Sequence, residues 1–279
     1  SVWQPVLDSE LARQVEKIQK ADLLLIQEFD RVCEELGLGY FICGGTMLGY
    51  MRHQGFIPWD DDVDCAMLRE DYDRFIKEAG PLLKEGFFLQ TRDSDPNIPY
   101  LFTKIRLDNT EYITKYNENR DFHKGICLDI FPFDYLPNDL EEREAFVEEV
   151  LDAAKVHHKA ADQQYPVPKE EIEPRNEKEA QYIREQKARL ERYWKKDLKV
   201  THKAYLDVAT RYNAQAKELG LLTVGSFVPS YTFIDLKDLL PYQRGTFEAI
   251  SVSVPKRPDL FLTMQYGDFM KLPPRHDQV

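Results

Sequence analysis

Apolar side chains recur at steps of three and four residues between positions 8 and 36. This spacing puts them on one face of a helix, so the pattern predicts a long amphipathic helix that Gly37 can close. The apolar positions are Leu11, Val15, Ile18, Leu25, Phe29, Val32 and Leu36. A short apolar run at 40–43 follows and is typical of a buried strand.

Shorter apolar runs alternate with polar turns in the next part of the chain. Helical spacing at 46–53 and 71–79 predicts two short helices, and the apolar run at 63–68 between them predicts a strand. Four further runs have the composition of strands. They cover 87–90, 101–107, 111–114 and 125–131, with Asp108-Asn109 as a hairpin turn.

Beyond residue 138 the pattern changes twice. Residues 139–220 are charge-dense and helical in period, which predicts two or three helices. His157 and His158 have no partner spacing there and are expected on the surface. The segment is interrupted by Pro166, Pro168 and Pro174. From 221 to 279 strands and loops return. We therefore predict an α+β protein: a mixed β-sheet core with flanking helices in 1–138, a helical appendage, and a C-terminal segment packing back on the core.

The composition is that of an ordinary globular protein, with 43% apolar and 31% charged residues. A formal net charge of -12 argues against a nucleic-acid binder that relies on a basic face. Residues 1–138 hold 25 acids against 15 bases, so most of the excess lies there. Uniform solubilising charge would not place four of those acids within five positions, at Asp60, Asp61, Asp62 and Asp64.

Cysteine spacing and hydropathy indicate a compartment. The four cysteines have neither the spacing of a disulfide framework nor that of a zinc site, which predicts buried reduced thiols. They are Cys33, Cys43, Cys65 and Cys127. The apolar runs are too short to span a bilayer, and no signal-peptide pattern opens the chain. We expect a cytoplasmic protein with at most peripheral association with the inner face of the cell membrane.

Gly44 and Gly45 stand between a predicted strand and a predicted helix. Two glycines let the backbone approach a ligand, and the amides of a helix start favour a phosphate oxygen. A glycine turn without a ligand is the more common case, so the pair alone is weak evidence.

Asp62 and Asp64 flank Val63 at the start of a predicted strand, where alternation puts both carboxylates on one face. Neighbouring carboxylates repel unless a cation lies between them, and hard oxygen ligands suit Mg²⁺ or Mn²⁺. Taken alone, an acidic surface turn explains the cluster equally well. Beside the glycine pair, the cluster indicates phosphoryl transfer, which needs a phosphate cradle next to a metal.

The run GGTMLGYMRHQGFIPWDDDVDCAM at 44–67 closely resembles the LicD family, which includes the fukutin and fukutin-related proteins. That family belongs to the DNA polymerase β-like nucleotidyltransferase superfamily. Three further runs match it, at 69–75, 125–134 and 266–274. The resemblance covers most of the chain except the charged helical stretch, and it implies a nucleotidyltransferase-like core.

The resemblance implies a transferase that moves a phospho-substituent from a CDP-linked donor to a sugar hydroxyl and releases CMP. In bacterial members the substituent is typically phosphocholine, placed on a teichoic acid or other surface glycan. In fukutin-related members it is ribitol phosphate. We expect phosphocholine here, with ribitol phosphate or a sugar phosphate as the alternative. The expected partners are a small CDP-linked donor and a glycan or lipid-linked glycan acceptor, without nucleic acid.

The resemblance also assigns the donor-binding groups. Gly44 and Gly45, with the adjoining Thr46, match the glycine pair that approaches the donor phosphate. Trp59 could stack on a base or on a quaternary ammonium, and a core-anchoring role is favoured over both. Basic side chains must hold the diphosphate, although each candidate taken singly is more often a surface cation. The candidates are Arg52, His53, Lys104 and Arg106.

The carboxylates carry the expected chemistry. Asp62 and Asp64 match the family's metal-binding pair, so the expected cofactor is Mg²⁺ or Mn²⁺. A third carboxylate is expected on a later strand, and Asp129 stands in a suitable setting. Asp129 is then a third ligand or the base that takes the acceptor proton, unless it is a strand-end acid held by backbone amides.

Two other functions use the same residues. In nucleotidyl transfer, a hydroxyl attacks the α-phosphate of a nucleoside triphosphate and pyrophosphate leaves. In a non-catalytic module, the acidic run would hold a structural Ca²⁺. A Ca²⁺ loop normally spreads its ligands over about a dozen residues with a glycine at its turn. The run at 60–64 is shorter and contains no glycine.

Overall fold

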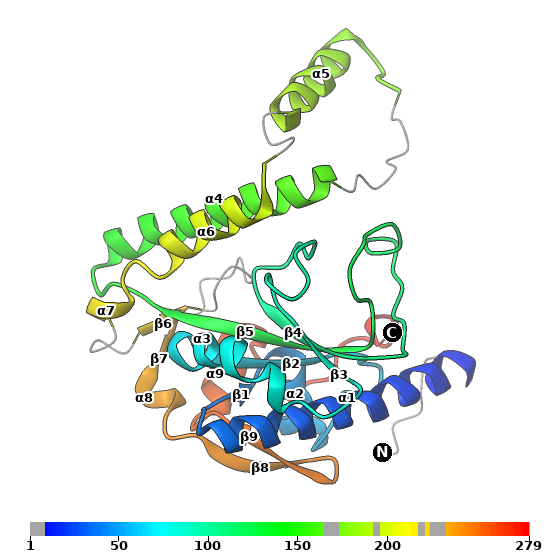
Figure 1. Cartoon of the computed structure of the whole chain (residues 1–279), viewed down its shortest axis with the longest axis vertical. Helices are drawn as coiled ribbons and strands as arrows, with labels where there is room; N and C mark the ends of the chain where they lie inside the picture. Colours follow the sequence, from blue (N-terminus) through cyan, green and yellow to red (C-terminus); the bar gives the residue numbers. More distant parts are fainter. Residues whose placement is uncertain (1–8, 165–172, 192–195, 217–220, 224–232, 279) are drawn as a thin grey trace.

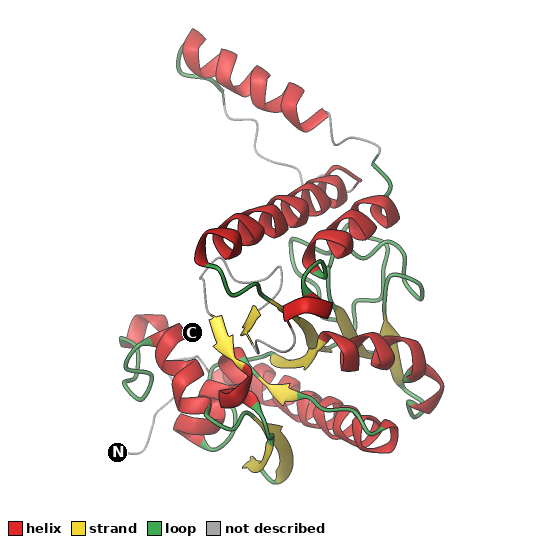
Figure 2. Cartoon of the chain, turned by 90° about the vertical axis from the view of Figure 1, so that its left-hand side faces the viewer, coloured by secondary structure: helices red, strands yellow, loops and turns green. Residues whose placement is uncertain are grey.

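A computed structural model describes residues 9–164, 173–191, 196–216, 221–223 and 233–278. A central sheet lies between helix α1 (Ser9–Leu36) on one side and the helices α4 (Leu140–Gln164) and α6 (Leu198–Ala209) on the other, as Figure 1 shows. Figure 2 gives the same arrangement from a view turned by 90°. The predicted α+β class is confirmed.

Helix α1 confirms the predicted N-terminal helix. Its apolar stripe is buried against the sheet, with Leu25 and Phe29 fully inaccessible to solvent. The Phe29 ring lies 4.7 Å from that of Tyr40 and 5.1 Å from that of Phe75. Gly37 follows the helix with a φ of +67°, a conformation that favours glycine.

Seven strands in the described part of the chain form one mixed sheet. They are β1 (Phe41–Ile42), β2 (Val63–Leu68), β3 (Phe87–Gln90), β4 (Thr103–Leu107), β5 (Cys127–Tyr135), β6 (Leu221–Thr223) and β7 (Phe233–Asp235). The strand order is β1-β2-β5-β4-β3, and β6 pairs with both β5 and β7. Only the β2–β5 pair among these is parallel. Because β5 lies between β2 and β4, side chains from these three strands are neighbours.

One predicted strand is wrong. Residues 111–114 form a loop, although the Tyr112 N–H donates to the Lys124 carbonyl at 2.7 Å. The Asn117 side chain forms hydrogen bonds with the backbone of this loop. It accepts from the Thr114 N–H at 2.8 Å and donates to the Tyr112 carbonyl at 2.9 Å. These side-chain bonds replace the ladder that a strand would need.

Two short helices flank β2 in the chain: α2 (Gly44–His53) and α3 (Arg69–Glu78). Helix α2 begins two residues earlier than predicted, so Gly44 and Gly45 form its first turn. Helix α3 is tied to β5, since the Arg69 guanidinium donates to both oxygens of Asp134 at 2.8 and 2.7 Å. Both side chains of this pair are buried.

The charged region is helical, as predicted. Besides α4 and α6 it contains α5 (Glu177–Glu191) and α7 (Asn213–Ala216). Helices α4 and α6 pack together around Phe146 and Tyr205, which join a buried cluster with Leu101 and Leu136. Helix α5 lies apart from them in Figures 1 and 2. Pro166 and Pro168 lie outside the described residues, and the domain boundaries at 138 and 220 stay a prediction.

His157 is buried, so its predicted surface position is wrong. Its Nδ1 lies 2.8 Å from Thr201 Oγ1, and its Nε2 lies 3.2 Å from Arg92 Nη2. A guanidinium can only donate, so Nε2 accepts and Nδ1 donates. Burial and the Arg92 charge lower the pKa of His157 to about 3. The ring is therefore a neutral linker between α4, α6 and the loop that carries Arg92.

The C-terminal part contains a second, two-stranded sheet. Strands β8 (Gln243–Phe247) and β9 (Ile250–Val254) form it, and helix α9 (Pro258–Tyr266) packs beside α2. Helix α8 (Leu236–Leu239) and the 3₁₀ turns Gly80–Leu82 and Arg275–Asp277 complete the described elements. Within the described residues, no helix combines the length and the apolar character needed to cross a membrane.

Candidate active site

Three predicted site carboxylates converge on one face of the central sheet. Asp64 on β2 is the direct neighbour of Asp129 on β5 in the parallel pair. Asp62 lies two residues before Asp64, so strand alternation directs both side chains to the same face. Asp62 is exposed, while Asp64 and Asp129 are half-buried. The sheet therefore brings together acids that are more than sixty positions apart in the chain.

Lys104 extends this cluster from β4. It is the direct neighbour of Asp129 in the antiparallel β4–β5 pair, and its Nζ lies 2.7 Å from Asp129 Oδ1. Burial opposes the ammonium charge, but the Asp129 carboxylate outweighs burial and raises the pKa of Lys104. The same Nζ lies 4.3 Å from the ring centroid of Tyr100, an attractive cation–π distance. A permanent positive charge thus stands beside the acids.

The glycine pair brings the first turn of α2 against the carboxylates. A Cβ atom on Gly44 would lie 3.3 Å from Asp64 Oδ2, and one on Gly45 would lie 2.9 Å from Asp60 Oδ2. Gly44 also has a φ of +55°, which disfavours other residues. Next to them, Thr46 Oγ1 accepts a hydrogen bond from the Asp64 N–H at 2.9 Å. A side chain at either position would therefore crowd the carboxylates, because the start of α2 already lies against them.

The acids raise one another's pKa. Burial first, and then the facing Asp129 and Asp62 carboxylates, raise the pKa of Asp64. Burial and the charge of Asp62 raise the pKa of Asp60 to about 8. The carboxyl group of Asp22 on α1 has a pKa raised to about 9, by burial and then by the acids at 60–62. Several carboxyl groups therefore hold protons in the folded protein near neutral pH.

We expect the cation-free protein to lose stability between about pH 7 and about pH 9. The folded protein keeps protons on Asp22 and Asp60 that the unfolded chain releases above about pH 4. A folded state that binds more protons loses free energy of unfolding as the pH rises. The melting temperature in chelator should therefore fall across this range. A constant or rising melting temperature would contradict the raised pKa values.

The donor set fits a divalent cation. Carboxylate oxygens are the ligands that Mg²⁺ and Mn²⁺ prefer, and Asp62, Asp64 and Asp129 supply them on one face. Both oxygens of the buried Asp22 lack a hydrogen-bond partner within the described part of the chain. Among the described residues no three His, Cys, Asp or Glu side chains already form a metal-binding group. Binding would therefore require these side chains to rotate toward the ion.

A pocket of about 220 Å³ opens beside the acids. Asp62, Asp129 and Lys104 form its polar wall. Three tyrosines that no local pattern indicates also line it, together with Ile18 of α1: Tyr100, Tyr112 and Tyr116. The Tyr112 hydroxyl donates to Asp61 Oδ2 at 2.7 Å. Asp61 is thus held by the pocket wall.

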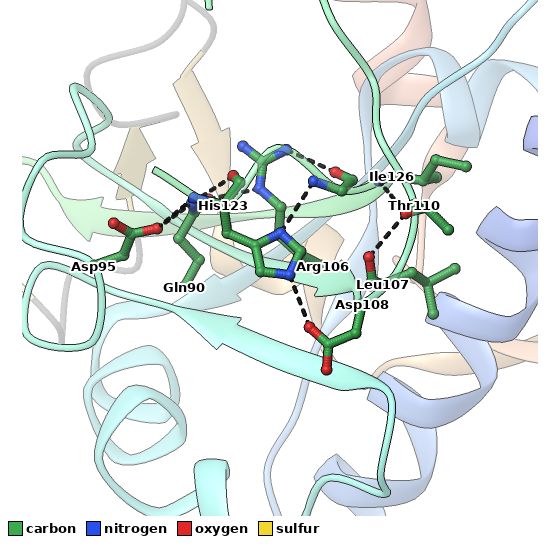
Figure 3. A network of polar contacts seen from close by, with 9 residues as sticks. Gln90, Asp95, Arg106, Leu107, Asp108, Thr110, His123 and Ile126 are labelled. Carbon is green, nitrogen blue, oxygen red and sulfur yellow. Dashed lines mark hydrogen bonds and ion pairs between the residues drawn. The ribbon is translucent and has the colours of Figure 1, made fainter. Parts of the chain in front are cut away.

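Arg106 also lines the pocket, but its guanidinium is engaged by protein groups. Its Nε donates to Gln90 Oε1 and its Nη1 to the Gly125 carbonyl, both at 2.8 Å. Figure 3 shows this network continuing through His123 to Asp95 and Asp108. Arg106 is 2% exposed, so it braces the loop between β4 and β5. Its predicted contact with the diphosphate stays a prediction.

Arg52, His53 and Trp59 do not line this pocket. Arg52 Nη1 donates to the carbonyls of Phe269 and Lys271, at 3.1 and 3.2 Å, and so binds the C-terminal segment. The His53 and Trp59 rings lie 6.3 Å apart, and Trp59 packs against the main core. This placement agrees with the favoured core-anchoring role of Trp59.

The four cysteines are unpaired, as predicted. Cys33 and Cys65 are buried, whereas Cys43 and Cys127 are only half-buried. Cys127 lines the pocket, with its Sγ 3.6 Å from Asp129 Oδ1. Burial, and then the Asp129 charge, raise the pKa of this thiol to about 11. It therefore stays a thiol at neutral pH.

The chain is similar to known proteins over the region that carries this site. Residues 37–181, just over half of the chain, match a family model described as LicD/FKTN/FKRP, nucleotidyltransferase domain. Lipopolysaccharide cholinephosphotransferase LicD of Haemophilus influenzae is 31% identical over 117 residues, which are 42% of this chain and 43% of that protein. Ribitol 5-phosphate transferase FKRP of Mus musculus is 27% identical over 131 residues, 46% and 23% of the two chains.

A third relative, ribitol-5-phosphate transferase FKTN of Mus musculus, is 36% identical over 67 residues, 23% of this chain and 14% of that protein. The chain thus spans less than half the length of each of these three relatives. The region matched by the family model contains all of the predicted site residues.

Proposed function

Because the chain belongs to the LicD/FKTN/FKRP nucleotidyltransferase-domain family, we propose that it transfers a phosphate-linked substituent from a CDP-linked donor to a glycan hydroxyl. The observation that carries this proposal is the meeting of Asp64, Asp129 and Lys104 on neighbouring strands beside the glycine turn of α2. Phosphoryl transfer needs little covalent chemistry from the protein, and it depends on positioning and on charge around the phosphates. In this site the start of α2 can position the phosphates, and the carboxylates and Lys104 supply the charge.

We assign separate roles in phosphate binding, cation binding and proton transfer to the residues of the site. The backbone amides of the Gly44 and Gly45 turn would hold donor phosphate, and Lys104 would add positive charge from β4. Asp62, Asp64 and Asp129 would hold Mg²⁺ or Mn²⁺, which supplies charge neutralisation for the phosphates when it is bound. The acceptor oxygen forms a bond to the phosphorus farther from cytidine, and the bond to the CMP oxygen breaks. Asp129 accepts the acceptor proton.

We propose phosphocholine as the substituent, and the lining of the pocket supports this choice. A quaternary ammonium binds well over aromatic faces, and Tyr112 lines the pocket beside Asp61 and Asp62. The rings of Tyr100 and Tyr116 line it too, but they already lie 4.3 Å from Lys104 Nζ and 4.1 Å from the Arg120 guanidinium carbon. The acids add attraction for a positive headgroup. Ribitol carries no charge and would gain little from these groups. The curated bacterial relative is named a lipopolysaccharide cholinephosphotransferase, which agrees with this choice.

The acceptor we propose is a glycan or lipid-linked glycan, reached from the cytoplasmic face of the membrane. The four unpaired cysteines fit a reducing compartment. A teichoic acid or a lipopolysaccharide offers the required sugar hydroxyl.

Ligand-dependent stabilisation tests the donor class. With Mg²⁺ present, CDP-choline should raise the melting temperature more than CDP-ribitol, CTP or ATP, because only this conjugate fills the phosphate, cation and headgroup sites together. Stabilisation by CTP and by no diphosphate conjugate would support nucleotidyl transfer instead. A stronger effect of CDP-ribitol would reassign the substituent.

Two variants at one position make the same experiment specific for the headgroup. Tyr112→Leu removes the ring and should weaken CDP-choline binding by about 0.5–2 kcal/mol, the range of a cation–π contact. Tyr112→Phe keeps the ring and loses only the bond to Asp61, so it should bind CDP-choline more tightly than Tyr112→Leu. Binding of CDP-ribitol should not separate the two variants. Equal CDP-choline affinity in both would exclude a headgroup contact with this ring.

A further inference from the structure

Asp22 is an acid on the buried face of α1. It lies four residues after Ile18 and three before Leu25, so it occupies the apolar stripe that packs against the sheet. Its side chain is 0% exposed, and neither carboxylate oxygen has a hydrogen-bond partner among the residues that the structure describes. A buried polar group without a partner costs free energy, and an unpaired charge costs much more. A residue of this kind requires a compensating group.

The surroundings of Asp22 place it behind the acidic cluster. One turn earlier in α1, Ile18 lines the pocket, and the Gln19 amide donates to the Asp60 carbonyl at 2.8 Å. Helix α1 packs on β4 and β5, the strands that carry Lys104 and Asp129. Burial, and then the charges of Asp62, Asp61, Asp60 and Asp129, raise the pKa of its carboxyl group. These four acids therefore repel a negative charge on Asp22.

We infer that Asp22 is a fourth carboxylate of the divalent-cation site, contributed by α1 from beneath the Asp62–Asp129 face. This inference rests on the proposed function, which requires the cation. A divalent ion beside Asp62 and Asp129 supplies the positive partner that the two Asp22 oxygens lack. It also converts the mutual repulsion of these acids into attraction through the ion. Asp22 then couples the position of α1 to the occupancy of the site.

The alternative is an acid that stays protonated and serves no ligand. Replacing such a neutral carboxyl group by another neutral group would not change the affinity for the cation. Asp22→Asn separates the two cases, since the amide has the same shape and cannot ionise. Under our inference the amide weakens cation binding. Under the alternative it leaves cation binding unchanged.

Mn²⁺ is the probe, because its free and bound forms are distinguished by electron paramagnetic resonance. We expect Asp22→Asn to bind Mn²⁺ at least about tenfold more weakly than the wild-type protein, the scale reported for losing a group that supports a metal site. Its cation-free melting temperature should equal or exceed that of the wild type, since a buried acid has been removed. The increase in melting temperature on adding Mn²⁺ should shrink in parallel.

Glu16→Gln is the matched control. Glu16 is an exposed acid on the same helix, so its replacement removes the same charge from α1 without touching the site. Its Mn²⁺ affinity should match the wild type. Asp64→Asn serves as the reference that loses the site itself. If Asp22→Asn does not fold, Asp22→Ser, also uncharged and smaller, is measured by the same criteria.

The outcomes separate the inference from the proposed function. Unchanged Mn²⁺ affinity in the Asp22 variant, with a large loss in Asp64→Asn, would overturn the role of Asp22 and leave the proposed function standing. Equal losses in Asp22→Asn and Glu16→Gln would assign the effect to general charge and also overturn it. If the wild type and Asp64→Asn bind Mn²⁺ alike, the cation site of the proposed function is wrong.

Discussion

Asp64→Asn should lower kcat with CDP-choline and Mg²⁺ by at least about a hundredfold, the loss typical when one preorganised electrostatic group is removed. Asp64 is central to the site, because it is the direct neighbour of Asp129 and a Cβ on Gly44 would touch its Oδ2. An amide of the same shape can neither carry the charge nor bind the cation as strongly. Steady-state release of CMP measures the effect.

The fold should survive this change. The bond from Thr46 to position 64 uses the backbone N–H and is kept in the variant. Removing an acid whose pKa is raised by burial and by neighbouring acids relieves repulsion in the cation-free protein. The melting temperature should therefore stay the same or rise. Asp152→Asn, at an exposed position of α4, is the matched control and should retain full activity. Loss of less than about tenfold in Asp64→Asn would contradict the assignment.

Arg69→Met should lower the free energy of unfolding by about 3–5 kcal/mol, the cost of breaking a buried ion pair at one partner. The Arg69 guanidinium makes two bonds to Asp134, and both side chains are almost inaccessible to solvent. The variant leaves the Asp134 charge buried, and the Asn213 amide, at 3.0 Å, is the side-chain donor that remains among the described residues. Urea denaturation of the purified proteins measures the change.

Two further variants check the cause. Arg74→Met, which removes an exposed pair with Glu78 on the same helix, should cost less than about 1 kcal/mol. Arg69→Met combined with Asp134→Leu should recover much of the loss, because no unpaired charge then remains buried. If the free energy of unfolding of the double variant is lower than that of Arg69→Met by a further large amount, the two side chains stabilise the fold through packing rather than through charge.

Local sequence patterns predict which acids belong to the site, but they do not predict that these acids lie next to one another in the fold. Alternation along one strand puts Asp62 and Asp64 on the same face, and it puts Lys104 on the same face as Arg106. The parallel pairing of β2 with β5 makes Asp64 and Asp129 neighbours, and it joins segments that no local pattern connects. The partners of Arg106 come from β3 and from the end of the following loop. Its structural role therefore depends on non-local contacts.

Two buried polar residues were predictable in principle from spacing. Asp22 falls on the apolar stripe of α1, three and four residues from Leu25 and Ile18. His157 similarly follows Val150 and Ala154, both buried positions of α4, at helical steps. A polar residue on a buried stripe indicates that a hydrogen-bonding or charged group lies against it, because it has lost its contact with water. The loop at 111–114 was not predictable in this way, because its apolar residues have strand composition and the Asn117 side chain overrides it.

Under the proposed function, the acceptor hydroxyl attacks the donor at the phosphorus farther from cytidine. Phosphorus NMR of CDP-choline, Mg²⁺ and a choline-free lipopolysaccharide or teichoic acid tests it most directly, with Asp64→Asn as the inactive control. We predict that the diphosphate signals are replaced by equal amounts of CMP and a choline phosphodiester on the glycan. Release of free phosphocholine with CMP attached to the glycan, or equal rates in the wild type and Asp64→Asn, would contradict the proposed function.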